Sequence, residues 1–353
     1  MRRQTLDDHL DAVLEEGAPG AVVLAADRSS TWEKAAGIAD LSTGAPMTPD
    51  HRFRIASVTK LFTAAVLLQL VDEGALALDA EVGSIEGGVT VRHLLNHTSG
   101  LQNFAEIDAL FEPYRKDRAH RSDLTPRDVL ALIEKTPRRF APGQGWFYTG
   151  SNYVVLGLLV EETTDATLAE ELRRRIIDPL GLEDTDLPDT FPTPAGLTRG
   201  YLPAENPVLP DPGPDPIDVT DIDIFSWGGG GMVSTARDIA RFLRAMLGGE
   251  LLRPAMRAEL LTTVASDWEE SAGYGLGIEE VTSLMGQAES PCGPAWGHLG
   301  FATGYTTIAL ASKDGDRQVV ILANTVFMSE EPWRTLADLT WACYCGRPAQ
   351  TSA

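Results

Sequence analysis

The chain has 353 residues, of which 43% are hydrophobic and 23% are charged, a composition typical of a globular protein with a sizeable core. Its 51 acidic and 29 basic residues give a formal net charge of -22. A surface this acidic repels phosphate backbones and anionic lipid, which argues against a nucleic-acid partner. No stretch approaches the roughly 18 uninterrupted apolar residues of a membrane helix, so no membrane partner is expected.

The chain begins with the pattern of a capped amphipathic helix. Thr5 and Asp8 have the spacing of a capping box, and Gly17 is a typical helix end. Two arginines near the start are followed by no apolar run, so the segment lacks the pattern of a secretory signal. The sequence as written therefore predicts a cytoplasmic protein, and an extracellular one only if a leader has been removed.

Strand patterns occur near both ends of the chain, and helix patterns occur between them. Strands are expected at residues 20–27 and 32–37, and a hairpin at residues 305–324, where two β-branched apolar runs surround an Asp-Gly turn. Residues 186–217 are dense in proline and are expected to contain no regular element. Helices are expected at residues 57–73, 91–96, 152–163 and 331–344.

This order of elements predicts an α+β fold in a single domain spanning residues 1–353. Residues 1–55 and 255–353 are expected to form an α/β lobe, an antiparallel sheet with the terminal helices on one face. Residues 56–254 are expected to form a mainly helical lobe that is inserted into it. A cleft between the lobes would place the start of the helix at residue 57 beside the sheet edge, where we expect the chemistry.

Residues 57–60 (SVTK) place a serine and a lysine on one face at the start of an apolar helix. At this spacing the Lys60 amine can reach the Ser57 hydroxyl. A hydroxyl is a poor nucleophile until a base removes its proton, and lysine can serve as the base when desolvation lowers its pKa. The pair alone is a weak signal, because such spacing occurs by chance in most long chains.

Two later segments supply candidate partners for this pair. Tyr148 lies just before an expected helix and could act as a phenolate base. His298 leads into the hairpin and could help to protonate a leaving group, while Gly300 would let a substrate lie along the strand edge. Three motifs in this order are typical of β-lactamases and penicillin-binding proteins.

The chain resembles class C β-lactamases, family VIII esterases and, most closely, secreted serine DD-carboxypeptidases. The resemblance extends over nearly the whole chain and implies a β-lactamase/transpeptidase-like fold. It implies that Ser57 is acylated and that Lys60 and Tyr148 activate it. The segments that carry it include residues 53–64 (FRIASVTKLFTA), 91–101 (VRHLLNHTSGL) and 229–235 (GGGMVST).

The same resemblance implies further site residues. The oxyanion hole would be the backbone N–H groups of Ser57 and Phe301, and Trp227 corresponds to a tryptophan that lines the cleft. Cys292 and Cys345 stand where secreted relatives carry a disulfide. The odd count of three cysteines, taken alone, favours idle thiols instead.

The sequence departs from the family pattern at three places. The Tyr-x-Asn motif reads YTG at residues 148–150, so the amide of Asn152 is a candidate substitute. The His-Thr-Gly-Thr motif reads HLGF at residues 298–301, and Glu279 stands where those relatives carry an arginine. Burying a substrate carboxylate against Glu279 would cost several kcal/mol, so a neutral ester or amide is the better substrate. A solvated Glu279 at a strand edge is the alternative.

The leading hypothesis is therefore a serine hydrolase that forms an acyl-Ser57 intermediate with an ester, an amide or a D-amino-acid peptide. One alternative is an acyltransferase or peptide cyclase that passes the acyl group to an amine, and another is an inactive binding or sensing module. No metal or other cofactor is expected, because His93 and His97 lack the glutamate and third ligand of a helical zinc site and are better explained by packing or capping. The expected partner is a small-molecule or peptide substrate, and protein partners are left open.

Overall fold

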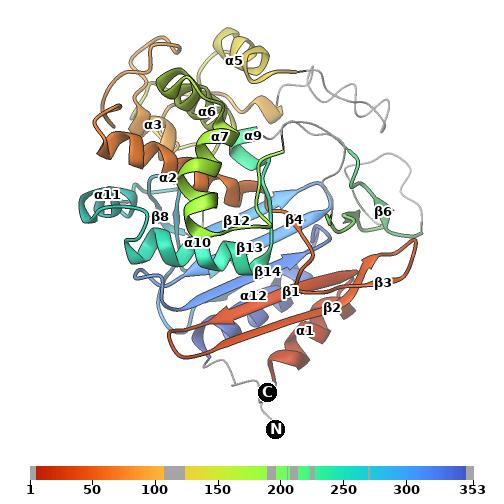
Figure 1. The fold of residues 1–353 in the computed structure, drawn as a ribbon. Coiled ribbons are helices and arrows are strands. Elements are labelled where there is room, and N and C mark those ends of the chain that lie inside the picture. The colour runs from red at the N-terminus through yellow and green to blue at the C-terminus, as the bar shows by residue number, and fades with distance from the viewer. Residues whose placement is uncertain are drawn as a thin grey trace.

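The structure is a computed structural model that describes residues 5–106, 124–188, 196–204, 206, 214–222, 227–268 and 271–346. At its centre is an eight-stranded antiparallel sheet to which both ends of the chain contribute (Figure 1). In spatial order its strands are β3 (Ala45–Pro46), β2 (Thr31–Asp40), β1 (Gly20–Ala26), β14 (Gln318–Ala323), β13 (Tyr305–Ala311), β12 (Ala295–Ala302), β9 (Glu279–Val281) and β8 (Ser271–Tyr274). The expected strands and hairpin are confirmed.

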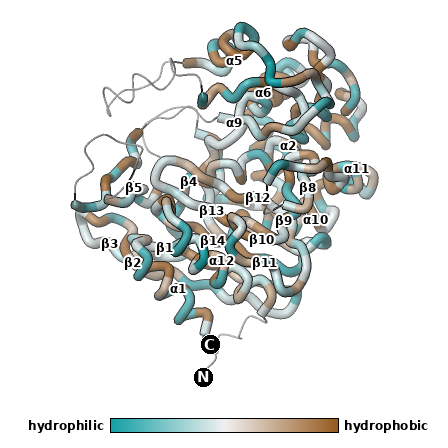
Figure 2. The backbone as a smooth tube through the Cα atoms, turned by 180° about the vertical axis from the view of Figure 1, so that it is seen from behind, coloured by the Kyte–Doolittle hydropathy of each residue, from teal (hydrophilic) through white to brown (hydrophobic). Residues whose placement is uncertain are grey.

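One face of the sheet is covered by the helices from the two ends of the chain, α1 (Leu6–Glu15) and α12 (Glu330–Cys345), which contact each other (Figure 1). The capping box of α1 is present, with the Asp8 amide donating to the Thr5 hydroxyl at 3.1 Å. Figure 2 shows hydrophilic and hydrophobic residues alternating along α1, as expected for a helix that buries one face. The buried side chains of α1 and α12 pack on the sheet in one apolar cluster.

The opposite face is covered by α10 (Ala236–Gly248), and the buried helix α2 (Thr59–Asp72) continues the same core into the helical part. Phe62 of α2 stacks on Phe242 of α10 with ring centres 3.6 Å apart. The other helices are α3 (Val91–Leu95), α5 (Pro126–Lys135), α6 (Ser151–Thr164), α7 (Leu168–Leu172), α8 (Asp178–Leu180), α9 (Trp227–Gly230) and α11 (Pro254–Leu260). The α+β architecture is confirmed, whereas the single domain and its lobe boundaries stay predictions.

Short strand pairs lie outside the main sheet. The expectation that residues 186–217 contain no regular element was wrong in detail. Strand β5 (Tyr201–Leu202) lies within this proline-rich stretch and pairs with β6 (Ile217–Asp218), which begins at its last residue. The other pairs are β4 (Phe53–Arg54) with β7 (Val233–Ser234) and β10 (Ser283–Leu284) with β11 (Ala288–Glu289). The pair of β4 with β7 holds the segment that leads into α2.

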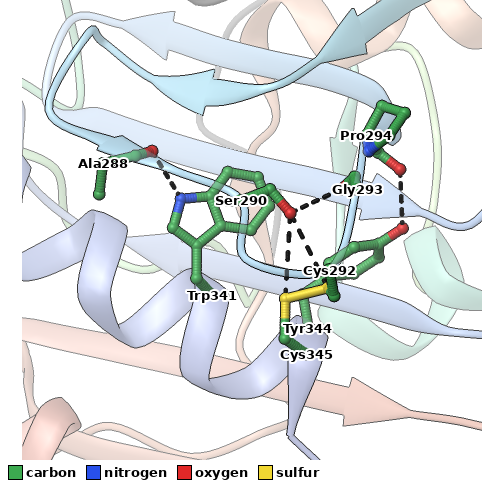
Figure 3. Close-up of a disulfide and its surroundings, with 8 residues drawn as sticks. All are labelled: Ala288, Ser290, Cys292, Gly293, Pro294, Trp341, Tyr344 and Cys345. Carbon is green, nitrogen blue, oxygen red and sulfur yellow. Dashed lines mark hydrogen bonds between the residues drawn. A yellow bond between two sulfur atoms is a disulfide. The ribbon is translucent and has the colours of Figure 1, made fainter.

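A disulfide between Cys292 and Cys345 ties the last residue of α12 to the turn before β12 (Figure 3). Trp341 donates to the Ala288 carbonyl at 2.9 Å and fastens the same helix to β11. The pairing that the resemblance implied is confirmed, while Cys343 is a buried free thiol. Disulfides are typical of proteins in oxidising compartments, which favours the extracellular alternative over the cytoplasmic one. Among the described residues no helix is both long and apolar enough to cross a membrane.

Replacing Cys292 and Cys345 together by serine should lower the free energy of unfolding by about 4 kcal/mol. The bond spans a sequence separation of 53 residues, and a cross-link of that length restricts the unfolded chain to about that extent. Urea titration of the oxidised protein and of the double variant measures the difference. The reduced wild-type protein is the matched control and should unfold like the variant; equal stability of all three would contradict the prediction.

Candidate active site

Ser57 lies in a single 3₁₀ turn, η1 (Ala56–Val58), immediately before α2. The preceding residue, Ala56, has a φ of 48°, a backbone conformation that is costly for a side chain other than glycine. Strand β12 packs directly on this turn: a Cβ added at Gly300 would lie 2.4 Å from the Ile55 carbonyl oxygen. Gly300 is therefore needed for the end of β12 to lie beside Ser57.

Lys60 reaches back from the first turn of α2 to the serine. Its Nζ donates to Ser57 Oγ at 3.0 Å and to the Gly229 carbonyl of α9 at 2.6 Å. The side chain is fully enclosed, and this burial lowers the pKa of the Lys60 amine from its usual value near 10 to about 7. At neutral pH a large part of the amine is therefore unprotonated and able to accept the hydroxyl proton.

Tyr148 brings its phenol to the same place. Lys60 Nζ lies 4.9 Å from the centre of the Tyr148 ring, and the phenolic oxygen is buried without a hydrogen-bond partner among the described residues. Burial raises the pKa of Tyr148, the nearby Ser57 hydroxyl opposes that rise, and a negative charge on Glu279 adds to it. The hydroxyl, the amine and the phenol thus converge at the start of one buried helix, and the phenol is held in its protonated form.

His298, on β12, is also buried in this group, but both of its ring nitrogens are used. The Leu299 carbonyl can only accept, so Nδ1 carries the proton and Nε2 accepts from the Tyr274 hydroxyl at 3.0 Å. Burial and then the charge of Lys60 lower the pKa of His298 to about 3. The imidazole is therefore neutral at neutral pH, and its role in leaving-group protonation stays a prediction.

Glu279 lies in β9 and is fully buried. It pairs with Gly297 on β12, one residue before His298. Burial raises the pKa of both Tyr148 and Tyr274, and a negative charge on Glu279 adds to both rises. The alternative of a solvated glutamate at a strand edge is wrong. Strand β9 pairs with β12 only as far as Gly297, and β12 also contacts the turn that carries Ser57.

Phe301 and Trp227 are two further residues that the sequence placed in the site. The side chain of Phe301 is 42% exposed and contacts Trp333, so only its backbone is suited to an oxyanion hole. Trp227 packs on Gly157, where an added Cβ would lie 2.6 Å from its ring. Its role beside a substrate stays a prediction.

Asn152 is buried and both ends of its amide are engaged within the protein. Its Oδ1 accepts from Ser99 at 2.6 Å, and its Nδ2 is 3.0 Å from His97 Nδ1. For Asn152 to hold a substrate carbonyl, as proposed from the sequence, one of these bonds would have to break.

An aromatic cluster around Tyr148 was missed by the sequence analysis. The half-buried rings of Trp146 and Trp268 lie 5.2 Å apart, and Trp268 lies 4.7 Å from Tyr148. Tyr274 and His97 lie against the same ring, at 6.2 and 4.4 Å. His97 stands in a segment that the motifs already marked and Trp146 lies two residues before Tyr148, whereas nothing in the sequence connects Trp268 or Tyr274 with Tyr148.

Thr90 caps α3 by accepting from the His93 amide at 3.2 Å, and the His93 ring accepts in return from the Thr90 amide at 3.3 Å, which is the capping role expected for His93. The described part of the chain holds no group of three or more histidine, cysteine, aspartate or glutamate residues suited to a metal ion.

Residues 4–340 match the family described as Beta-lactamase. A penicillin-binding protein of Bacillus subtilis (strain 168) is 26% identical over 92% of this chain and 72% of its own, and esterase EstB of Burkholderia gladioli is 31% identical over 83% of this chain and 78% of its own. A crystal structure of a D-stereospecific amidohydrolase from Streptomyces sp. superposes with a TM-score of 0.81 at 30% identity, covering 97% of this chain and 98% of that one.

The reactivity of Ser57 should depend on the charge of Lys60. Because burial lowers the pKa of Lys60 to about 7, labelling of Ser57 by a fluorophosphonate should rise as the pH rises through 7 and then level off. Lys60→Ala should slow labelling by roughly 100-fold or more, since a positioned base contributes at least that much. Lys34→Ala, at a partly exposed lysine paired with Asp7, is the control. A labelling rate that is flat across this pH range would refute the assignment.

Proposed function

The chain belongs to the beta-lactamase family of serine hydrolases, and from this premise we propose that it cleaves esters or amides through an acyl group carried on Ser57. The observation that carries the proposal is the 3.0 Å hydrogen bond between Ser57 and a lysine whose burial lowers its pKa to about 7. The family and fold expected from the sequence are confirmed by the comparisons.

In the proposed reaction neutral Lys60 accepts the Ser57 proton while Oγ attacks the substrate carbonyl carbon. The bond to the leaving group then breaks, and the proton passes to the leaving group through the phenol of Tyr148. Because the pKa of Tyr148 is raised, we assign it this relay in place of the phenolate base expected from the sequence. Water, activated by the same groups, then cleaves the acyl-serine ester and restores Ser57.

Two features of the site guide the proposal for the substrate. We propose that the buried Glu279 carboxyl is ionised and so disfavours a substrate carboxylate nearby. The rings of Trp146 and Trp268 favour an apolar or aromatic side chain. The similar Streptomyces structure is that of a D-stereospecific amidohydrolase. We therefore favour neutral amides and esters of apolar D-amino acids as substrates.

Intact-mass spectrometry should detect an acyl adduct on the wild-type protein during turnover of a p-nitrophenyl ester, and none on Ser57→Ala. Ser312→Ala, at a half-buried serine in the turn after β13, is the matched control and should react like wild type. Adding an amine to the pre-formed adduct tests whether water or an amine resolves it. Absence of an adduct on wild type, with no fluorophosphonate labelling, would favour a binding module over an enzyme.

A negative charge on the substrate should lower kcat/KM because Glu279 repels it. A D-alanyl-D-alanine peptide should be cleaved about tenfold or more slowly as its free carboxylate than as its carboxamide, because two negative charges at short range in a partly dry site repel by more than 1 kcal/mol. Glu279→Gln should reduce that ratio in kcat/KM. Glu280→Gln, at the half-buried neighbour on the same strand, should leave it unchanged. Equal ratios in all three proteins would overturn this substrate preference.

A further inference from the structure

His97 is a buried histidine at the centre of the site to which the proposed reaction assigns no role. It follows α3 in the left-handed backbone region, with a φ of 64°, and its side chain is fully enclosed. This left-handed turn ends α3 as a helix C-cap, with the Thr98 amide donating to the His93 carbonyl at 2.9 Å.

Three hydrogen bonds connect His97 to the segment that carries Tyr148. The Phe147 amide donates to the His97 carbonyl at 2.9 Å, and the Thr149 amide donates to His97 Nδ1 at 3.2 Å. Asn152 Nδ2 is the third partner, 3.0 Å from the same Nδ1. Tyr148 lies between the first two of these donors, so its backbone is held to His97 on both sides.

The partners of Nδ1 fix the protonation of the ring. A backbone N–H can only donate, so Nδ1 must accept and the single proton of a neutral imidazole must lie on Nε2. Nε2 is buried and has no hydrogen-bond partner among the described residues. The ring itself lies 4.4 Å from the ring of Tyr148 and 5.6 Å from that of Tyr153, so His97 holds the phenol ring as well as its backbone.

Burial and the charge of Lys60 keep His97 in this form. Burial lowers the pKa of His97 well below the usual value, and the positive charge of Lys60 lowers it further. A second proton would have to displace the Thr149 and Asn152 donors from Nδ1. The titratable groups against the ring, or acting on it, are Lys60 of α2, Tyr148, Tyr153 of α6, Tyr274 of β8 and His298 of β12.

We propose that His97 is the positioning residue for Tyr148: its neutral imidazole, protonated on Nε2, holds the phenol beside Ser57 and Lys60 for proton transfer. The inference rests on the proposed function, since it assigns a residue to that same reaction. It departs from the sequence analysis, in which His97 was a packing or capping residue.

The test compares two substitutions of His97. His97→Ala removes both the acceptor and the ring, and should lower kcat about 100-fold with KM within about threefold, since a displacement of order 1 Å in a catalytic group costs about that much. His97→Asn keeps an acceptor at the position of Nδ1 and tolerates the left-handed backbone, so it should recover at least tenfold of the loss. His93→Ala removes the other imidazole of the same segment and should leave kcat unchanged.

The pH profile separates positioning from packing. If the phenol moves in His97→Ala, water reaches Lys60 and the midpoint of the pH–rate curve should rise above 7, whereas a packing residue would lower only the folded fraction. Activity is expressed per reactive site by counting the fluorophosphonate-labelled fraction. An unchanged kcat per labelled site and an unchanged midpoint would overturn the positioning role.

A measurement on the wild-type protein covers the case in which the His97 variants fail to fold. Nitrogen-15 NMR should assign the imidazole of His97 as neutral and protonated on Nε2 from pH 5 to 8, and an Nδ1 proton or a charged ring in that range would overturn the proposal. If wild type itself neither hydrolyses esters nor labels at Ser57, the proposed function fails. If wild type reacts and His97→Ala reacts equally, only the role of His97 fails.

Discussion

Burial of the Lys60 side chain raises the free energy of its charged form, and the chemistry of the whole site depends on this effect. The side chain is enclosed by the turn before α2, by α9 and by the rings of Tyr148 and Tyr153, which leaves it hydrogen bonds to Ser57 and Gly229 but little water. Removing water from an ammonium group favours its neutral form. The fold therefore provides a base for the serine, and no carboxylate of the described residues forms an ion pair with it.

The neutral protonation states of His97 and His298 have the same cause, the burial of the site around Lys60. A positive charge on either imidazole would repel Lys60, and both pKa values are lowered by burial and by that lysine. Each ring is instead held as one neutral tautomer, Nε2-protonated in His97 and Nδ1-protonated in His298, by partners that can only donate or only accept. The only buried acid of the group, among the described residues, is Glu279. Burial raises the pKa of Tyr148 and Tyr274 and so keeps their phenols protonated, and the charge of Glu279 adds to that rise.

The scaffold holds the two halves of this site together with small residues and a cross-link. Gly300 allows β12 to lie against the Ile55 carbonyl, and Ala56, which precedes Ser57, has a strained backbone with a φ of 48°. The disulfide at the turn before β12 fastens the other end of the same segment to α12. The position of the strand beside the nucleophile is therefore set from the sheet, while Lys60 and Tyr148 are set from the helical part.

Local patterns were enough to predict the elements and part of the site. Hydrophobic periodicity, the Thr5 capping box and the Asp-Gly hairpin depend on residues close in sequence, as does the spacing that brings Lys60 to Ser57. The pKa of Lys60, the burial of Glu279 and the contact of Trp268 with Tyr148 depend on segments more than 100 residues apart, which only the packed chain brings together. The role that we infer for His97 was equally hidden, because a sequence shows a histidine but not the two donors that fix its proton.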